Sequence, residues 1–189
     1  MKNKKLLLVL FISICSISYS QKNTIVPKSQ ISIEKNIFGI QTGLFGVWAY
    51  NETKLSDKVA LRSELGLNLG LFGGSFYPKT GYVFYPTVTL EPRFYYNLGR
   101  RAKLNKKTSN NSANFFSLKT SYGSDLFIIS NYDLVVDDHI TAIPKYGIRR
   151  SFGKSFEFEF SAGIGYGYNL ESKISDAVLD LGFRIGYRF

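Results

Sequence analysis

The residues of this chain that could do chemistry gather around its only histidine, His139. Asp137 and Asp138 precede it directly, and Ser130 and Asp133 lie a short way upstream. A serine, a histidine and a carboxylate can form a nucleophilic triad, which could deacylate a lipid such as lipid A. The aspartates and the histidine could instead hold a divalent cation, because such ions bind oxygen ligands. Both sites need a geometry that spacing does not supply, so a solvated loop is the simpler interpretation.

No other motif predicts a catalytic, cofactor or metal site. The glycines in residues 163–167 alternate with Ile164 and Tyr166, and no helix pattern follows them, so they do not form a dinucleotide-binding turn. Cys15 is the only cysteine, and no Cys/His spacing is typical of zinc. The sequence therefore predicts no catalytic residue, no cofactor and no metal ligand, which favours a protein that is not an enzyme.

Residues 1–20 have the three-part layout of a secretory signal peptide. A basic n-region, an apolar h-region and small residues before a cleavage site follow one another: Lys2, Lys4 and Lys5, then residues 6–14, then Ser18 and Ser20. A transmembrane helix would need roughly 20 apolar residues, which this segment lacks. We predict an exported protein that loses residues 1–20, with a flexible lead-in over residues 21–29 and one domain over residues 30–189.

Alternation of apolar and polar residues predicts β-strands throughout this domain. It is strictest from Leu179 to Phe189, where every second residue is apolar and the others are polar or glycine. A period of two is typical of a strand with one apolar and one polar face. The pattern recurs over five ranges, less cleanly in the third and fourth: residues 58–71, 82–98, 116–128, 141–149 and 155–170. Prolines disfavour central strands, so Pro86, Pro92 and Pro144 predict bulges or strand ends.

The strand from Leu179 to Phe189, these five ranges and a further strand over residues 38–50 make seven strands. A barrel whose two chain ends lie at the same rim needs an even number of strands. A short eighth strand is therefore predicted over residues 30–33. The connections alternate between tight turns (residues 55–58 and 151–154) and longer loops (residues 73–81, 131–139 and 171–175). Membrane barrels alternate in this way between periplasmic turns and outer loops. The basic stretch 99–114 has no apolar period, which predicts a loop or a disordered turn.

The bulk of the apolar rows decides which way they face. The interior of an eight-stranded barrel is just wide enough to be filled by side chains, so it cannot hold rows of Phe and Tyr from every strand. The apolar rows must face outward, where only lipid covers such a band. The aromatic share of 16% fits girdles at the two rims. We expect Trp48, Tyr50, Phe94, Tyr96, Tyr187 and Phe189 at one rim, and Phe76, Tyr77, Tyr82 and Phe84 at the other.

The opposite rows place charged side chains inside the barrel. The predicted inward charges are Arg62, Glu64, Glu91, Arg93, Lys119, Asp125, Lys145, Arg149, Glu157, Glu159, Asp180, Arg184 and Arg188. Because buried charges must be paired, we expect a plug of salt bridges, with a narrow ion path as the alternative. The net charge is +10 at pH 7, but the basic residues do not share one helix face, so an anionic lipid surface is a better partner than nucleic acid.

Taken together, the chain resembles the small OmpA/OmpX-type outer-membrane β-barrels, in particular the porin-family-like barrels of the Bacteroidota. The matching features are the signal peptide, the turn at residues 55–58 with Arg62 and Glu64 after it, the run 91–96, and the aromatic ending 182–189, which resembles the insertion signal of such barrels. The resemblance implies an all-β, antiparallel up-and-down transmembrane β-barrel of eight strands in the cell outer membrane of a Gram-negative bacterium.

The resemblance also implies partners and leaves the activity open. Outer-membrane lipid, lipopolysaccharide and the barrel assembly machinery are the expected partners, and small closed barrels are usually monomers. Families of this type host several functions, so the fold does not select one. The main hypothesis is a non-enzymatic barrel that serves envelope integrity or surface interaction. The alternatives are a narrow pore for ions or small solutes, and an outer-leaflet lipid-modifying enzyme that uses His139.

Overall fold

The computed structural model describes residues 31–75 and 78–189 of the chain. The signal peptide over residues 1–20, the lead-in over residues 21–29, and Phe76 and Tyr77 lie outside the described residues, so those predictions stay predictions. Among the described residues, no helix combines the length and the hydropathy that crossing a bilayer requires.

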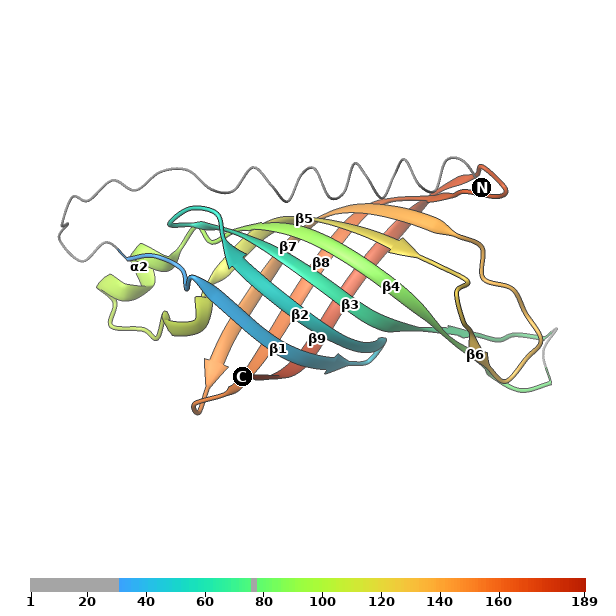
Figure 1. The fold of residues 1–189 in the computed structure, drawn as a ribbon, viewed down its shortest axis with the longest axis horizontal. Coiled ribbons are helices and arrows are strands. Elements are labelled where there is room, and N and C mark those ends of the chain that lie inside the picture. The colour runs from blue at the N-terminus through green and yellow to red at the C-terminus, as the bar shows by residue number, and fades with distance from the viewer. Residues whose placement is uncertain (1–30, 76–77) are drawn as a thin grey trace. The chain divides into compact units, whose positions relative to one another are not determined.

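Eight antiparallel strands form a closed barrel, and a ninth short strand extends it at one end (Figure 1). Each barrel strand pairs with the next along the chain, and β1 pairs with β9 to close the wall. This confirms the predicted all-β, up-and-down antiparallel barrel. The barrel strands are β1 (Asn36–Gly43), β2 (Gly46–Lys54), β3 (Val59–Phe72), β4 (Gly81–Phe94), β5 (Asn114–Gly123), β7 (His139–Phe152), β8 (Phe156–Asn169) and β9 (Ser175–Arg188), while β6 (Ile129–Ser130) pairs with the far end of β4.

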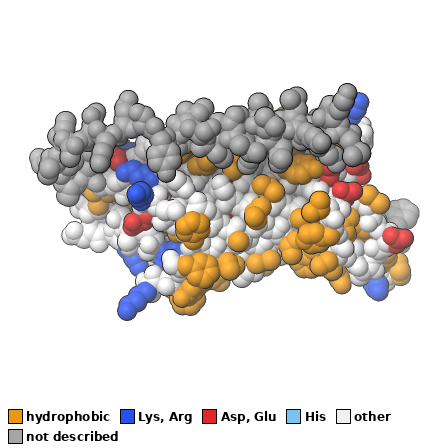
Figure 2. All heavy atoms as spheres, viewed as in Figure 1, with side chains coloured by type: hydrophobic (Ala, Val, Ile, Leu, Met, Phe, Trp, Pro, Cys, Tyr) orange, Lys and Arg blue, Asp and Glu red, His pale blue; other side chains and the backbone are white. Residues whose placement is uncertain are grey.

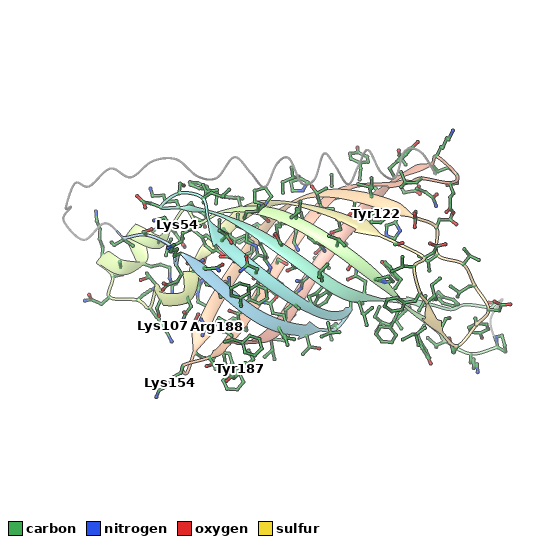
Figure 3. The ribbon with its side chains drawn as sticks, viewed as in Figure 1. Lys54, Lys107, Tyr122, Lys154, Tyr187 and Arg188 are labelled. Atoms are coloured by element: carbon green, nitrogen blue, oxygen red, sulfur yellow. The ribbon has the colours of Figure 1, made fainter. Side chains whose placement is uncertain are left out.

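The two ends of the barrel differ in their connections. We call the end with the short β2–β3 and β7–β8 turns the turn end, and the opposite end, which carries β6, the loop end. Figure 3 shows Lys54, Lys107, Lys154 and Arg188 together at the turn end and Tyr122 toward the loop end. In the β2–β3 turn the Lys54 ammonium donates to Asp57 at 2.7 Å, and this hydrogen bond lowers the pKa of the Asp57 carboxyl.

The prediction for the first strands was wrong. Residues 38–50, predicted as one strand, belong to the β1–β2 hairpin, and residues 31–34 are not a strand, so β1 replaces the eighth strand placed at residues 30–33. The hairpin turns at Leu44 and Phe45, which carry none of the usual turn chemistry. Gly46 supplies the backbone freedom instead, because its φ is +144° and a Cβ there would lie 2.2 Å from the Leu67 carbonyl oxygen.

Two of the three prolines were also interpreted wrongly. Pro86, Pro92 and Pro144 all lie inside long strands, and the register of the neighbouring pairs is the same on both sides of Pro92 and Pro144. The β4–β5 ladder skips Pro92 and the β7–β8 ladder skips Pro144, as expected for a residue without a donor. Pro92 and Pro144 therefore interrupt the hydrogen bonding without shifting it, whereas the β4–β5 ladder ends at Thr87, directly after Pro86.

The barrel is apolar outside and charged inside. Phe160, Leu181 and Ile185 are 52%, 55% and 46% exposed, and hydrophobic side chains of this kind cover the middle of the face shown in Figure 2. Trp48 and Tyr50 do not belong to a rim girdle as predicted, because both are buried on the inner face, 6% and 4% exposed. The single strand predicted over residues 38–50 is in fact a hairpin, so Trp48 and Tyr50 lie on β2 and not at the end of the first strand.

The basic stretch 99–114, predicted as a loop or a disordered turn, connects β4 to β5 and contains two short helices. These are α2 (Leu98–Lys103) and the 3-10 helix η2 (Ser109–Asn111), which lie at the turn end. Leu98 and Ala113 are buried and join an apolar cluster there, together with Ile33, Ala60, Tyr95 and Phe115. Asn110 and Asn111 adopt positive φ angles, which asparagine tolerates better than most residues. The turn end of the barrel is thus closed by packed side chains.

The space around two glycines, one in the barrel wall and one in α2, gives a first prediction. A Cβ at Gly165 of β8 would lie 2.2 Å from the Ala142 carbonyl oxygen and 2.7 Å from the Ile143 Cα, whereas nothing lies within 4 Å of a Cβ at Gly99 of α2. We expect Gly165→Ala to lower the free energy of unfolding by about 1–3 kcal/mol through overpacking. Gly99→Ala should raise it by about 0.5–1 kcal/mol, because alanine favours the helix.

The two variants are compared by denaturant titration of the folded protein, followed by circular dichroism. The two midpoints are expected to move in opposite directions from that of the parent chain. Equal midpoints for the two alanine variants would contradict the close strand packing at residue 165.

Candidate functional site

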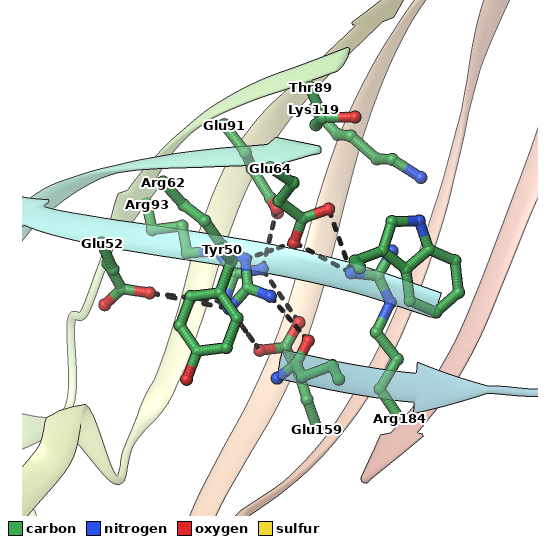
Figure 4. A network of polar contacts seen from close by, with 12 residues as sticks. Tyr50, Glu52, Arg62, Glu64, Thr89, Glu91, Arg93, Lys119, Glu159 and Arg184 are labelled. Atoms are coloured by element: carbon green, nitrogen blue, oxygen red, sulfur yellow. Dashed lines mark hydrogen bonds and ion pairs between the residues drawn. The ribbon is translucent and has the colours of Figure 1, made fainter. Parts of the chain in front are cut away.

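The inward charges form two sets of ion pairs inside the barrel, a large one and a smaller one made by Lys119, Lys145 and Asp180, and we call them together the lumen network. Figure 4 shows part of the large set. The members of the lumen network are Glu52, Arg62, Glu64, Glu91, Arg93, Lys119, Lys145, Arg149, Glu157, Glu159, Asp180, Arg184 and Arg188. All the charges predicted to face inward are present except Asp125, which lies exposed in the loop after β5. Glu52 was missed, because the predicted strand over residues 38–50 ends before it, whereas β2 continues to Lys54.

Arg149 of β7 lies at the centre of the half of the lumen network that is nearest the turn end. Its guanidinium donates to Glu52 at 2.8 Å, to Glu157 at 2.6 Å and to the Tyr50 hydroxyl at 2.6 Å. The Tyr50 hydroxyl in turn donates to the other oxygen of Glu157 at 2.6 Å. Arg149, Glu52 and Glu157 are fully buried, so each charge depends on its partners rather than on water.

A second group surrounds Arg93 of β4. Its guanidinium donates to both oxygens of Glu159, at 2.7 and 2.9 Å, and to Glu91 at 2.7 Å. Arg62 of β3 donates to Glu64 and, at 2.6 Å, to Gln41. These contacts join side chains from opposite sides of the barrel, so the charges span the lumen.

Aromatic rings cover the faces of three of these arginines. The guanidinium carbon of Arg62 lies 3.7 Å from the centroid of the Tyr50 ring, and that of Arg93 lies 4.3 Å from the Phe115 ring. Arg184 of β9 stacks in the same way on Trp48 at 3.7 Å. In each case the ring covers one face of the planar guanidinium, which its in-plane hydrogen bonds leave free. The network therefore packs densely as well as pairing its charges.

In the layer of the network nearest the loop end, the cations outnumber the carboxylates. Lys119 of β5 and Lys145 of β7 both donate to Asp180 of β9, at 2.6 and 2.9 Å. Arg184 pairs with Glu64 at 2.9 Å. This layer thus holds three cations and two carboxylates. Beyond it lies a cavity of about 450 Å³, lined in part by Lys119, Asp180 and Arg184.

His139 lies at the first position of β7 and lines the same cavity. Its Nδ1 lies 2.9 Å from the Asp137 carbonyl oxygen, and its ring packs edge-on against Tyr85. Ser130 donates to the Tyr82 carbonyl at 2.8 Å. The contacts recorded for His139 and Ser130 therefore join neither to the other, and the structure does not assemble the triad that spacing allowed.

The acidic residues beside His139 take part in loop contacts. Asn169 donates to the Asp137 carboxylate at 2.7 Å, and this hydrogen bond lowers the pKa of Asp137. Asp138 accepts from the Tyr122 hydroxyl at 2.5 Å. No group of three or more metal-ligating side chains is present in the part of the chain that the structure describes. The geometry thus gives no support to the predicted alternative of a divalent-cation site.

Comparison of the chain with models of protein families, with curated proteins and with solved structures finds no match. The features that bear on function are therefore those of the barrel itself: its apolar outer surface, its lumen network and its cavity.

Proposed function

We propose that this chain is an integral outer-membrane β-barrel protein, not an enzyme, whose sealed barrel serves envelope integrity or surface interaction. The observation that carries the proposal is the apolar outer surface. Large hydrophobic side chains are exposed on every strand of the barrel, among them Phe38, Val47, Leu65, Val88, Phe116, Ile140, Phe160 and Leu181. Soluble monomers rarely expose contiguous apolar patches of more than a few hundred Å², whereas lipid covers such a surface readily.

The closed wall supports the same proposal. Within a bilayer core every backbone N–H and C=O needs a protein partner, and a closed barrel supplies one along each paired strand. Here β1 and β9 pair from Gly39 with Arg188 to Gly43 with Arg184, which completes the wall around the turn-end half of the lumen network. In a membrane, the turn end with its short connections would face the periplasm and the loop end would face outward.

The basic turn end suits an anionic headgroup region. Lys54, Lys107 and Lys154 lie there (Figure 3). Outer-membrane lipid would contact the apolar band, and lipopolysaccharide would surround the loop end. A barrel with a filled lumen acts through these surfaces, so surface interaction and mechanical continuity of the envelope are the roles that suit it best.

The proposal is tested by locating the protein and by comparing its gel mobility before and after heating. Co-fractionation with outer membranes and a heat-dependent shift in mobility are expected, because a closed hydrogen-bonded wall resists detergent. A protein found soluble in the periplasm, with no shift, would overturn the proposal. The apolar surface would then have to be covered by another protein.

The narrow-pore alternative predicts a different electrical result. The buried pairs of Arg149 with Glu157 and of Arg93 with Glu159 occupy the lumen, and the apolar cluster with Leu98 closes the turn end. We therefore expect no discrete current steps when the purified protein is inserted into planar bilayers. Reproducible ohmic steps from protein that has passed the mobility test would replace the sealed barrel with the pore.

A further inference from the structure

The barrel wall has a gap on one side of its loop-end half. The β1–β2 hairpin ends where Gly43 faces Arg184 of β9 and Gly46 faces Asn68 of β3, while β9 and β3 both continue beyond it. In Figure 1 the hairpin stops well short of the far ends of β3 and β4. Among the described residues, no strand pairs with residues 175–183 on the edge of β9 that faces the hairpin.

The cavity opens through this gap. Its lining includes Asp180 and Arg184, which face the lumen, and also Leu179, Leu181 and Phe183, which face outward on the same strand. On the other strands only inward-facing residues line the cavity, and outward-facing ones occur only on β9 and at Leu69 of β3, the two strands that continue beyond the hairpin. Leu44 and Phe45 of the hairpin turn form the floor of the opening. The cavity is therefore continuous from the lumen to the apolar outer surface.

The inner end of the cavity is cationic. Lys119 and Lys145 share the single carboxylate of Asp180, and their side chains are only 13% and 3% exposed. Arg184 lines the cavity beside them, and its partner Glu64 also pairs with Arg62. The cations outnumber the carboxylates in this layer, so an anionic group that entered from the gap would restore the balance.

We propose that this cavity binds a long-chain amphiphile with an anionic head, of the fatty-carboxylate class. The head accepts hydrogen bonds from Lys119 and Arg184, and the alkyl chain lies through the gap along Leu44, Phe45 and Leu181. The volume of about 450 Å³ lies within the range of small-ligand pockets. The inference rests on the proposed insertion into a bilayer, because the chain of the ligand leaves the cavity toward lipid.

The protein carries its own reporter for this site. Trp48 is the only tryptophan, lines the cavity and is held by a 2.8 Å hydrogen bond from its Nε1 to Asn68. Arg184 stacks on its ring. A brominated alkyl chain within contact distance quenches tryptophan emission, so occupancy can be measured on the unmodified full chain.

The test begins with flotation of the protein in phosphatidylcholine vesicles. Dibromostearic acid is then titrated, with dibromostearyl alcohol as the neutral counterpart. The acid is expected to quench Trp48 saturably at concentrations where the alcohol does not, and unbrominated oleate should restore the emission. Equal quenching by the acid and the alcohol, or no saturable phase, overturns the inference.

Two substitutions should move the affinity for the acid in opposite directions. Lys119→Gln removes one cation and should weaken binding about tenfold, the scale of one charge-assisted hydrogen bond. Asp180→Asn releases both lysines and should strengthen binding. Lys154→Gln, in the β7–β8 turn at the other end of the barrel, should change nothing. Because a folding defect would weaken binding in both cavity variants, the opposite signs distinguish recognition from damage.

The outcomes also separate the two proposals. A chain that does not float with the vesicles overturns the membrane location and the ligand site with it. A chain that floats and shifts in mobility on heating, but shows no preference for the acid over the alcohol, leaves the sealed membrane barrel standing and removes the ligand alone. Should Lys119→Gln fail to fold, the acid and alcohol titrations of the parent chain and of Asp180→Asn still decide.

Discussion

Replacing Arg149 with methionine is expected to lower the free energy of unfolding by about 3–5 kcal/mol, the usual cost of breaking a buried ion pair from one side. Arg149 is fully buried and donates to Glu52 at 2.8 Å and to Glu157 at 2.6 Å. Methionine fills most of the volume, but it leaves both carboxylates inside the barrel without this partner. The measurement is urea titration of the vesicle-inserted protein, read from the band that resists unfolding in an unheated gel.

The controls separate lost charge from lost packing. Arg100→Met, at an exposed position of α2, should leave the urea midpoint nearly unchanged. Adding Glu157→Gln to Arg149→Met should recover part of the lost stability, because it removes the negative charge from one of the two carboxylates that lose Arg149 as a partner. If Arg149→Met unfolds at the urea concentration of the parent protein, the lumen network does not hold the barrel together. If the double variant is no better than the single one, packing rather than charge explains the loss.

Introducing a charge on the outer surface should have the second-largest effect. Phe160 lies near the middle of β8, opposite Phe183 of β9, and is 52% exposed. If lipid covers this surface, Phe160→Arg should cost about 2–4 kcal/mol, as cationic residues do near the midplane of membrane barrels. If water covers it, the same change should be neutral or favourable. The sign of the effect therefore reports directly on the solvent around the barrel.

The measurement is refolding into vesicles over a urea series, scored as the fraction with heat-dependent mobility. Leu104→Arg is the matched control, since Leu104 follows α2 outside the barrel wall and is 56% exposed. It should refold like the parent chain. A Phe160→Arg variant that refolds equally well would argue against the proposed membrane location, whatever the behaviour of the lumen variants.

The lumen network could be predicted to a large extent, because alternation along a strand assigns each residue to one face. The parity of Arg93 and Glu91 in β4, or of Glu157 and Glu159 in β8, follows from the sequence as soon as the strand is recognised. Parity does not give the partners. Arg93 meets Glu159 across the barrel, and that contact depends on closure and on the register of every strand between them.

The predictions that failed, for the β1–β2 hairpin and for residues 98–113, have a common cause. In both segments the local sequence pattern indicates one structure, and contacts with the rest of the fold impose another. The β1–β2 turn at Leu44 and Phe45 has no turn residues of its own and depends on Gly46. Residues 98–113 show no apolar period, yet they order because Leu98 and Ala113 reach the apolar cluster at the turn end. Tertiary contacts with distant residues decide both segments, and no window of the sequence contains those contacts.

The sequence by itself determined the class of fold, the direction of the strand faces outside the β1–β2 hairpin, and the charged character of the interior. Those properties follow from a period of two and from the limited width of a small barrel. Only the tertiary structure decided that the β1–β2 hairpin is short, that Trp48 faces the lumen, and that a cavity opens beside β9. Register and closure set these features, because they depend on which residues lie opposite one another after the wall has formed.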